Sequence, residues 1–232
     1  MFDGKYKAVT FSYDDGVTQD LRLIELFNKY GLKATFNLNS ELLDTDNHLV
    51  IRGKEIAHNK VSANSVRSIY AGHEIAVHTL THPHLTQLSD AEVIRQVEQD
   101  RLNLSRLAGY EVVGMAYPYG TESTNAHIAR LLADNTGVRY ARTTTTTYHF
   151  APEQDLFLMG ATVHHTDMDK MFALGEEFIH LQADTPQIFY IWGHSYEFDI
   201  DDTWDRFEEF CQLISHRDDI YYGTNKEILL LD

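Results

Sequence analysis

The chain has 232 residues, and 43% of them are hydrophobic, which is enough for a folded core in a single domain. Lysine and arginine total 19 against 35 aspartates and glutamates, so the formal charge of −16 argues against nucleic acid and anionic lipid as partners. The single cysteine, Cys211, excludes an intrachain disulfide and a cysteine-rich zinc site. No apolar run approaches the roughly 18 residues that span a bilayer, so we expect no membrane insertion.

The first residues, MFDGKYKAVTF, lack the basic start and the long apolar stretch of a signal peptide. As written, the sequence predicts a cytoplasmic protein, or an exported one if a leader has been removed. The composition leaves the oligomeric state open.

Short apolar runs alternate with helical patterns along the chain. The runs at 7–13, 33–38, 73–78, 112–117, 137–143 and 187–193 are typical of strands. Helical patterns occupy 18–31, 89–109, 123–135, 167–182 and 201–216, while 44–72 is polar and less regular, with a helix expected only near its end. This order predicts an α/β fold with a largely parallel sheet, closed or nearly closed, in one domain over residues 1–232.

The segment 89–109 carries the clearest helix signals. Ser89 and Glu92 have the spacing of a capping box, and Gly109 is a typical helix stop. We therefore predict one continuous helix across this segment.

Unusual polar residues follow several of the predicted strands. Asp14 and Asp15 come after the first, His78 and His82 after a middle one, and His194 after a late one. In parallel α/β folds the chemistry gathers at the carboxyl ends of the strands. We therefore expect these side chains to share one edge of the sheet.

The motif HTLTH places two histidines four residues apart, at positions 78 and 82. Such a pair can share a divalent metal ion. Pro83 disfavours helical geometry at His82, so the turn must be short or irregular. The pair alone is equally well explained as surface histidines, or as one buried histidine with hydrogen-bond partners.

The stretch FSYDDG, residues 11–16, places two carboxylates side by side. Taken alone, such a stretch is usually an ordinary turn. Beside two imidazoles, however, one carboxylate could be the third metal ligand and the other a base toward water. Neighbouring residues at a strand end point in different directions, so Asp14 and Asp15 can divide these two tasks.

These motifs together resemble the polysaccharide deacetylases of the NodB-homology type, carbohydrate esterase family 4. FSYDDG resembles that family's first motif, HTLTH its second, AYPYG (116–120) its third, and IFYIWGH (188–194) its fifth, in the family's order. The resemblance implies a distorted (β/α) barrel of seven or eight units and a mononuclear site.

Residue by residue, the resemblance implies a divalent metal ion held by Asp15, His78 and His82. Zinc is the expected ion, with cobalt, nickel or manganese as alternatives. The family's remaining roles fall on Asp14 as the base, on His194 as the acid that protonates the leaving amine, and on the main-chain N–H of Tyr119 as an oxyanion donor.

The sequence departs from the family pattern at two places. Ala116 stands where the third motif has an arginine that orients the base, and we propose Arg142 as its substitute. Without a cation, the pKa of Asp14 would be expected to rise. The fourth motif, an aspartate with a nearby tryptophan, has no clear counterpart.

Candidate substrate contacts are Pro118 and Tyr119 of the third motif, together with His165 and Tyr196. Aromatic rings can pack on the apolar faces of sugars, although core and rim packing explains them equally well. His165 follows a strand-like run, where it could line the mouth of the site.

Three functions remain open at this point. The first is a metal-dependent hydrolase that removes N-linked acetyl groups from a sugar in an oligo- or polysaccharide, or O-linked acetyl groups at the same site. The second is an amidase acting on a small acylated molecule. The third is a decayed scaffold that binds glycan without turnover.

Overall fold

The computed structural model, which describes residues 1–230, is built around a nine-stranded sheet whose strands all pair in parallel. The strands follow the order β8-β7-β6-β5-β2-β1-β10-β9, and β11 pairs with β1 beside β2. Their bounds are β1 Lys7–Asp14, β2 Ala34–Leu38, β5 Glu74–Val77, β6 Gly114–Ala116, β7 Tyr140–Thr146, β8 Met159–Ala161, β9 Val163–His164, β10 Gln187–Gly193 and β11 Ile220–Tyr222. The predicted parallel α/β fold is confirmed.

The two ends of the sheet meet in one stretch of chain. Residues Met159–Ala161 pair with β7, and Val163–His164 pair with β10. Thr162, between them, donates its N–H to Tyr190 O at 2.8 Å. The sheet therefore comes round on itself, as a distorted barrel requires.

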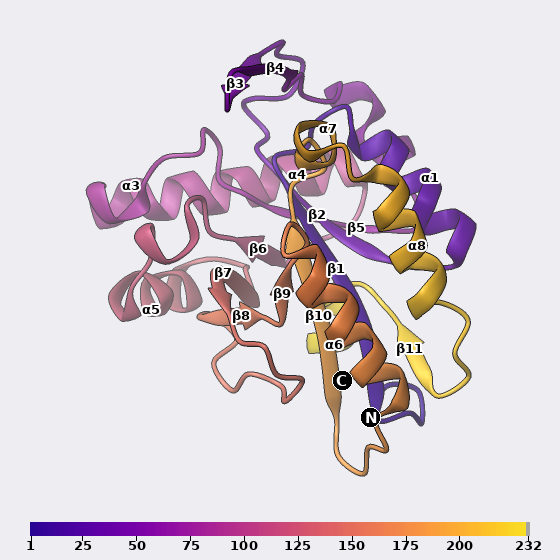
Figure 1. Cartoon of the computed structure of the whole chain (residues 1–232). Helices are drawn as coiled ribbons and strands as arrows, with labels where there is room; N and C mark the ends of the chain where they lie inside the picture. The colour runs from indigo at the N-terminus through magenta and orange to yellow at the C-terminus, as the bar shows by residue number, and fades with distance from the viewer. Residues whose placement is uncertain (231–232) are drawn as a thin grey trace.

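Helices cover the outside of the sheet (Figure 1). Their bounds are α1 Asp20–Tyr30, α2 Val66–Ile69, α3 Asp90–Ile94, α4 Asp100–Ala108, α5 Ala126–Asn135, α6 Met168–His180, α7 Glu197–Asp201, α8 Trp204–Ile214 and α9 Asn225–Leu229. Every residue of β1 is buried, as expected of a central strand in a covered parallel sheet. Aromatic side chains from β1, α1 and α8 fill the space beneath the helices, with Phe11 4.7 Å from Phe27 and 6.3 Å from Phe207 between ring centroids.

The predicted helix at 89–109 forms, but it is interrupted. A π-helical turn, Arg95–Gln99, separates α3 from α4, and Gly109 ends the helix in the left-handed conformation. The widened turn leaves the carbonyl of Gln96 free to accept the N–H of Leu80 at 3.0 Å. The interruption therefore ties this helix to the loop that carries the two motif histidines.

Several short elements were not predicted. Residues 44–72 contain an antiparallel hairpin, β3 His48–Ile51 and β4 Lys54–Ala57, which stands beside α7 at one end of the molecule (Figure 1). Arg52 holds Asp201 at 2.8 Å, and Lys54 donates to the carbonyls of α7. Within residues 1–230, no helix combines the length and hydropathy that crossing a bilayer needs.

Candidate active site

The polar residues singled out from the sequence lie at the carboxyl ends of neighbouring strands. Asp14 ends β1, His78 follows β5, Arg142 lies in β7 and His194 follows β10. Parallel pairing aligns these ends, which places the side chains along one edge of the sheet.

Asp15, His78 and His82 converge as a metal-type donor set. Their ligand atoms lie within 4.8 Å of one another, with Asp15 Oδ1 4.0 Å from His78 Nε2 and 3.8 Å from His82 Nε2. His78 Nδ1 donates to Ala116 O at 2.8 Å, which leaves the Nε2 lone pair free for a cation. Burial lowers the pKa of both histidines, that of His82 to about 4, so both are neutral as ligands must be. One carboxylate and two imidazoles fit a catalytic zinc ion or a similar divalent ion.

The loop that carries the histidines is irregular rather than helical. Thr79 and His82 both have positive φ, at 68° and 58°. Asn39 anchors the loop through the carbonyls of His78 and Thr79. The buried carboxylate of Asp100 accepts the N–H of His78 at 3.2 Å. Tertiary contacts therefore supply the geometry that a helical turn would otherwise give.

The neighbouring pair of aspartates divides into two environments, because backbone direction changes between them. Asp14 is the last residue of β1, whereas Asp15 has φ 82° and Gly16 has φ 61°. A Cβ on Gly16 would lie 2.6 Å from Leu38 Cδ2, so the turn requires glycine. The glycine after the two aspartates thus lets one face Arg142 and the other face the histidines.

Asp14 is held by a buried cation. Arg142 Nη2 lies 2.5 and 2.6 Å from its two carboxylate oxygens, and Asn37 Nδ2 donates to Oδ1 at 2.8 Å. Arg142 itself is fully buried, with its guanidinium 4.4 Å from the centre of the Trp192 ring. Burial alone would raise the pKa of Asp14, but the charge and hydrogen bonds of Arg142, together with His78 and His194, lower it.

Asp15 has two further partners that the sequence did not suggest. His58 Nε2 lies 3.2 Å from Asp15 Oδ2, and Lys60 Nζ lies 3.5 Å from Oδ1 and donates to the Asp15 carbonyl at 2.7 Å. Burial would raise the pKa of Asp15, whereas these two groups hold it well below its usual value. Both come from the stretch after β4, in the region where the sequence shows no regular pattern.

His194 is paired with a carboxylate three residues later, Glu197. Glu197 Oε2 lies 3.2 Å from His194 Nδ1 and accepts the His194 N–H at 2.9 Å. Burial would lower the pKa of His194, but the charge and hydrogen bond of Glu197, together with the charges of Asp15 and Asp14, raise it to about 9. The same imidazole charge lowers the pKa of Glu197. The sequence shows no clear counterpart of the fourth motif, and Glu197, in the short helix α7, has no pattern around it that would have marked it.

His165 lies behind this pair rather than at the mouth of the site. It is 1% exposed, its Nε2 is 2.9 Å from Glu197 Oε2, and its Nδ1 is 3.1 Å from the Tyr13 hydroxyl. Both ring nitrogens are engaged and the ring is covered. We therefore do not propose His165 as a substrate contact.

A cleft of about 480 Å³ opens beside the metal-type donor set. Tyr196 lines it, together with Asp15, His58 and His82. Tyr119 is about half exposed, its ring stacks on His84 at 3.8 Å, and Pro118 beside it is buried. Tyr119 also has positive φ, 56°, which turns the chain sharply after β6. Substrate contact by these residues stays a prediction.

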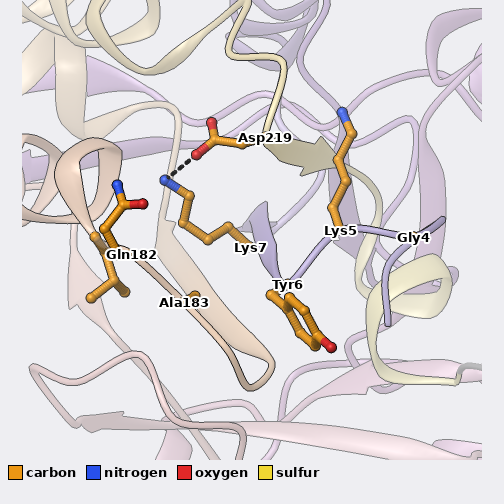
Figure 2. Close-up of a pocket in the computed structure, with 8 residues that line it drawn as sticks. Gly4, Lys5, Tyr6, Lys7, Gln182, Ala183 and Asp219 are labelled. Atoms are coloured by element: carbon orange, nitrogen blue, oxygen red, sulfur yellow. Dashed lines mark ion pairs between the residues drawn. The ribbon is translucent and has the colours of Figure 1, made fainter.

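Another cleft, of about 320 Å³, lies at the opposite, amino-terminal end of β1 (Figure 2). Two lysines line it, Lys5 and Lys7, and Lys7 is paired with Asp219 at 2.7 Å and donates to the carbonyls of Phe178 and Ile179 at the end of α6. A cation at a helix carboxyl terminus is a stabilising arrangement. This cleft therefore has a structural lysine and none of the groups predicted for chemistry.

Comparison with known proteins identifies the family of the chain. The sequence profile described as polysaccharide deacetylase matches residues 3–141. A peptidoglycan-N-acetylglucosamine deacetylase of Bacillus cereus is 29% identical over 123 residues, which is 51% of this chain and 39% of the relative. The chain thus spans well under half of that curated relative's length.

The fold is shared with solved structures of other proteins. The chitin deacetylase of the fungal pathogen Colletotrichum lindemuthianum is 20% identical, with a TM-score of 0.60, over 97% of this chain and 88% of its own. A family 4 carbohydrate esterase from Streptomyces lividans, in complex with acetate, is 18% identical, with a TM-score of 0.54, over 91% and 88%. With the profile match covering more than half of its length, the chain belongs to the polysaccharide deacetylase family.

Proposed function

We propose that the protein is a metal-dependent hydrolase that removes N-linked acetyl groups from a sugar within an oligo- or polysaccharide. One observation carries the proposal. The carboxylate of Asp14 paired with Arg142, the metal-type donor set and the imidazole of His194 paired with Glu197 lie at the same edge of the sheet. Family membership supports the reaction class, and the relative's name supports an N-acetylated sugar as substrate.

Asp14 has the environment of a general base. Arg142 and Asn37 fix its carboxylate in one orientation and keep it ionised, so it can accept a proton from an attacking water. Because Arg142 occupies both carboxylate oxygens, the base is held in place rather than free to rotate. Arg142 is therefore our candidate for the role of the arginine that Ala116 replaces.

Asp15, His78 and His82 would hold the divalent ion, and one carboxylate with two imidazoles is a donor set that suits zinc. Such an ion would act as a Lewis acid toward the acetyl carbonyl and make a nearby water more acidic. The main-chain N–H of Tyr119 is the proposed second donor to the oxygen that gains charge.

His194 supplies the proton that the leaving amine needs. As the carbon–oxygen bond to water forms and the carbon–nitrogen bond breaks, the nitrogen takes a proton from the His194 imidazolium. Glu197 keeps that imidazole protonated at neutral pH. An ester's oxygen leaves more readily than an amide's nitrogen, so a strongly held acid favours amide over ester substrates.

Acetate release from N-acetylglucosamine oligomers tests the proposal directly. The protein loaded with one equivalent of zinc should release acetate, and a chelator or Asp14→Asn should abolish the release. His194→Ala should reduce turnover of the amide more than turnover of an O-acetylated xylan oligomer. Binding of the oligomer without any release, unchanged in Asp14→Asn, would instead identify a glycan-binding scaffold, and turnover of small acylated amines alone would identify a small-molecule amidase.

A further inference from the structure

Three histidines surround the single carboxylate of Glu197. Its Oε2 lies 2.9 Å from His165 Nε2, 3.2 Å from His194 Nδ1 and 3.4 Å from His164 Nε2. His164 lies in β9, His165 follows β9 directly, and His194 is the residue after β10. The proposed reaction uses His194 and Glu197 but gives no task to His164 and His165.

His164, His165 and Glu197 also form a compact donor set. Their ligand atoms lie within 4.8 Å of one another, as do those of the Asp15 site. Two imidazoles and one carboxylate are the donor combination already described at Asp15, and they suit zinc and similar ions.

The outer nitrogen of each imidazole has an oxygen partner. His165 Nδ1 lies 3.1 Å from the Tyr13 hydroxyl oxygen, and His164 Nδ1 lies 2.7 Å from Thr166 Oγ1. The Thr166 main-chain N–H also donates to His164 Nδ1, at 3.3 Å. In a metal-bound histidine the ring N–H lies on the other nitrogen, Nδ1 here, where such an oxygen can accept it while Nε2 binds the metal.

The position of the set also permits access. The side chains of His164 and Glu197 are each 20% exposed, whereas His165 is enclosed against β10. A Cβ on Gly193 would lie 2.7 Å from His165 Nε2, so the glycine leaves room for this ring. The set thus has a covered inner ligand and two outer ligands that solvent can reach.

We propose that His164, His165 and Glu197 form a second transition-metal site, which takes zinc when zinc exceeds one equivalent and thereby inhibits the enzyme. The inhibition rests on the proposed function, because a cation bound to Glu197 withdraws that carboxylate from His194. His194 then loses the carboxylate that accepts its main-chain N–H at 2.9 Å and contacts its ring nitrogen at 3.2 Å, so its imidazole is no longer held in place. Zinc would be required at the Asp15 site and harmful at this one.

Zinc stoichiometry tests the site without any reference to activity. The intact protein is equilibrated against rising free zinc, and zinc per chain is measured. We expect wild type to rise from one to two, and His164→Gln to stop at one. Thr166→Val, which removes only the outer hydroxyl partner, should reach two at roughly tenfold higher free zinc.

The matched control is His127→Gln, since His127 is an exposed histidine that contacts one carboxylate, Asp90, at 2.9 Å. His127→Gln should bind two zinc ions per chain at the same free zinc concentrations as wild type. Circular dichroism of each variant confirms folding, and Thr166→Val replaces an exposed residue. The proposal is overturned if wild type never exceeds one zinc, or if His164→Gln reaches two at the wild-type concentration.

Acetate release then tests the consequence. For each protein, the rate in excess zinc is divided by its own rate at one equivalent. We expect this ratio to fall about tenfold in wild type, given the usual contribution of a general acid, and to stay near unity in His164→Gln. Two bound zinc ions without any acetate release would support the second zinc site and refute the proposed function. Acetate release with only one bound zinc would support the proposed function and refute the second site.

Discussion

Arg142 contacts both carboxylate oxygens of Asp14 through one nitrogen, at 2.5 and 2.6 Å, and both residues are buried. The two residues are 128 positions apart in the chain and lie on β1 and β7. The guanidinium therefore reaches the base across the width of the sheet.

Replacing this guanidinium should shift the acidic limb of the pH–rate profile. In Arg142→Gln, burial no longer has an opposing cation, so the pKa of Asp14 rises and activity is lost at pH values where wild type still works. Removing one partner of a buried pair should also lower the free energy of unfolding by about 3–5 kcal/mol. Chemical denaturation and kcat/KM against pH check both effects.

The control for that variant is Arg130→Gln, since Arg130 makes an exposed ion pair with Asp134. Such a pair contributes about 0–1 kcal/mol, so stability and the profile should stay close to wild type. An unshifted acidic limb in Arg142→Gln would show that Arg142 does not set the protonation of the base.

The pairing of His194 with Glu197 predicts the alkaline limb. The acid must be protonated, so activity should persist up to about pH 9 and be lost as the pH rises through that value. In Glu197→Gln, burial acts without the opposing carboxylate and the limb should move toward neutral pH. The measurement is kcat/KM against pH with one equivalent of zinc, and Glu176→Gln, an exposed residue of α6, is the control.

Metal removal should abolish turnover reversibly. A chelator, or His82→Gln, which removes one of three ligands, should reduce acetate release by about 100-fold or more, and zinc or cobalt should restore only the chelated wild type. Metal content per chain, measured beside the rate, links the loss to the ion. Full activity in metal-free protein would refute metal dependence.

Asp100 predicts a link between stability and the metal site. It is fully buried and accepts the N–H groups of Ser40 and His78, at 2.7 and 3.2 Å. Asp100→Ala leaves both donors without this acceptor, so unfolding should cost about 1–3 kcal/mol less. Zinc affinity should also fall about tenfold, because the His78 loop loses an anchor. Thermal melting and a zinc titration test this, with exposed Asp134→Ala as the control.

The parallel sheet and the convergence of Asp15, His78 and His82 could be predicted because local patterns indicate them. Apolar runs mark the strands, and the aspartates and histidines stand directly after strands whose ends must align. Arg142 could be proposed from its position near the end of a strand, but its contact with Asp14 depends on β1 and β7 curving toward one another. Nothing local to either strand specifies that approach.

The partners of the predicted residues were harder to find. Glu197 lies in the short helix α7, which gives no periodic signal, and His58 and Lys60 follow a hairpin in a polar segment. The strands β8 and β9 have three and two residues, too few for an alternating pattern. Such residues are positioned by long-range packing, so their roles become visible only in three dimensions.

Thr162 lies between β8 and β9, where the two edges of the sheet meet, so the order in which the sheet folds affects when the site is assembled. His164 and His165 belong to the stretch that links the two edges of the sheet, and Glu197 lies beyond the last long strand. In a nascent chain whose edges have not yet joined, Glu197 can already pair with His194 three residues away, but His164 and His165 do not yet lie against that pair. The complete cluster around Glu197 should therefore form only when the sheet closes, and local opening at this seam should disperse it before the hydrophobic interior unfolds.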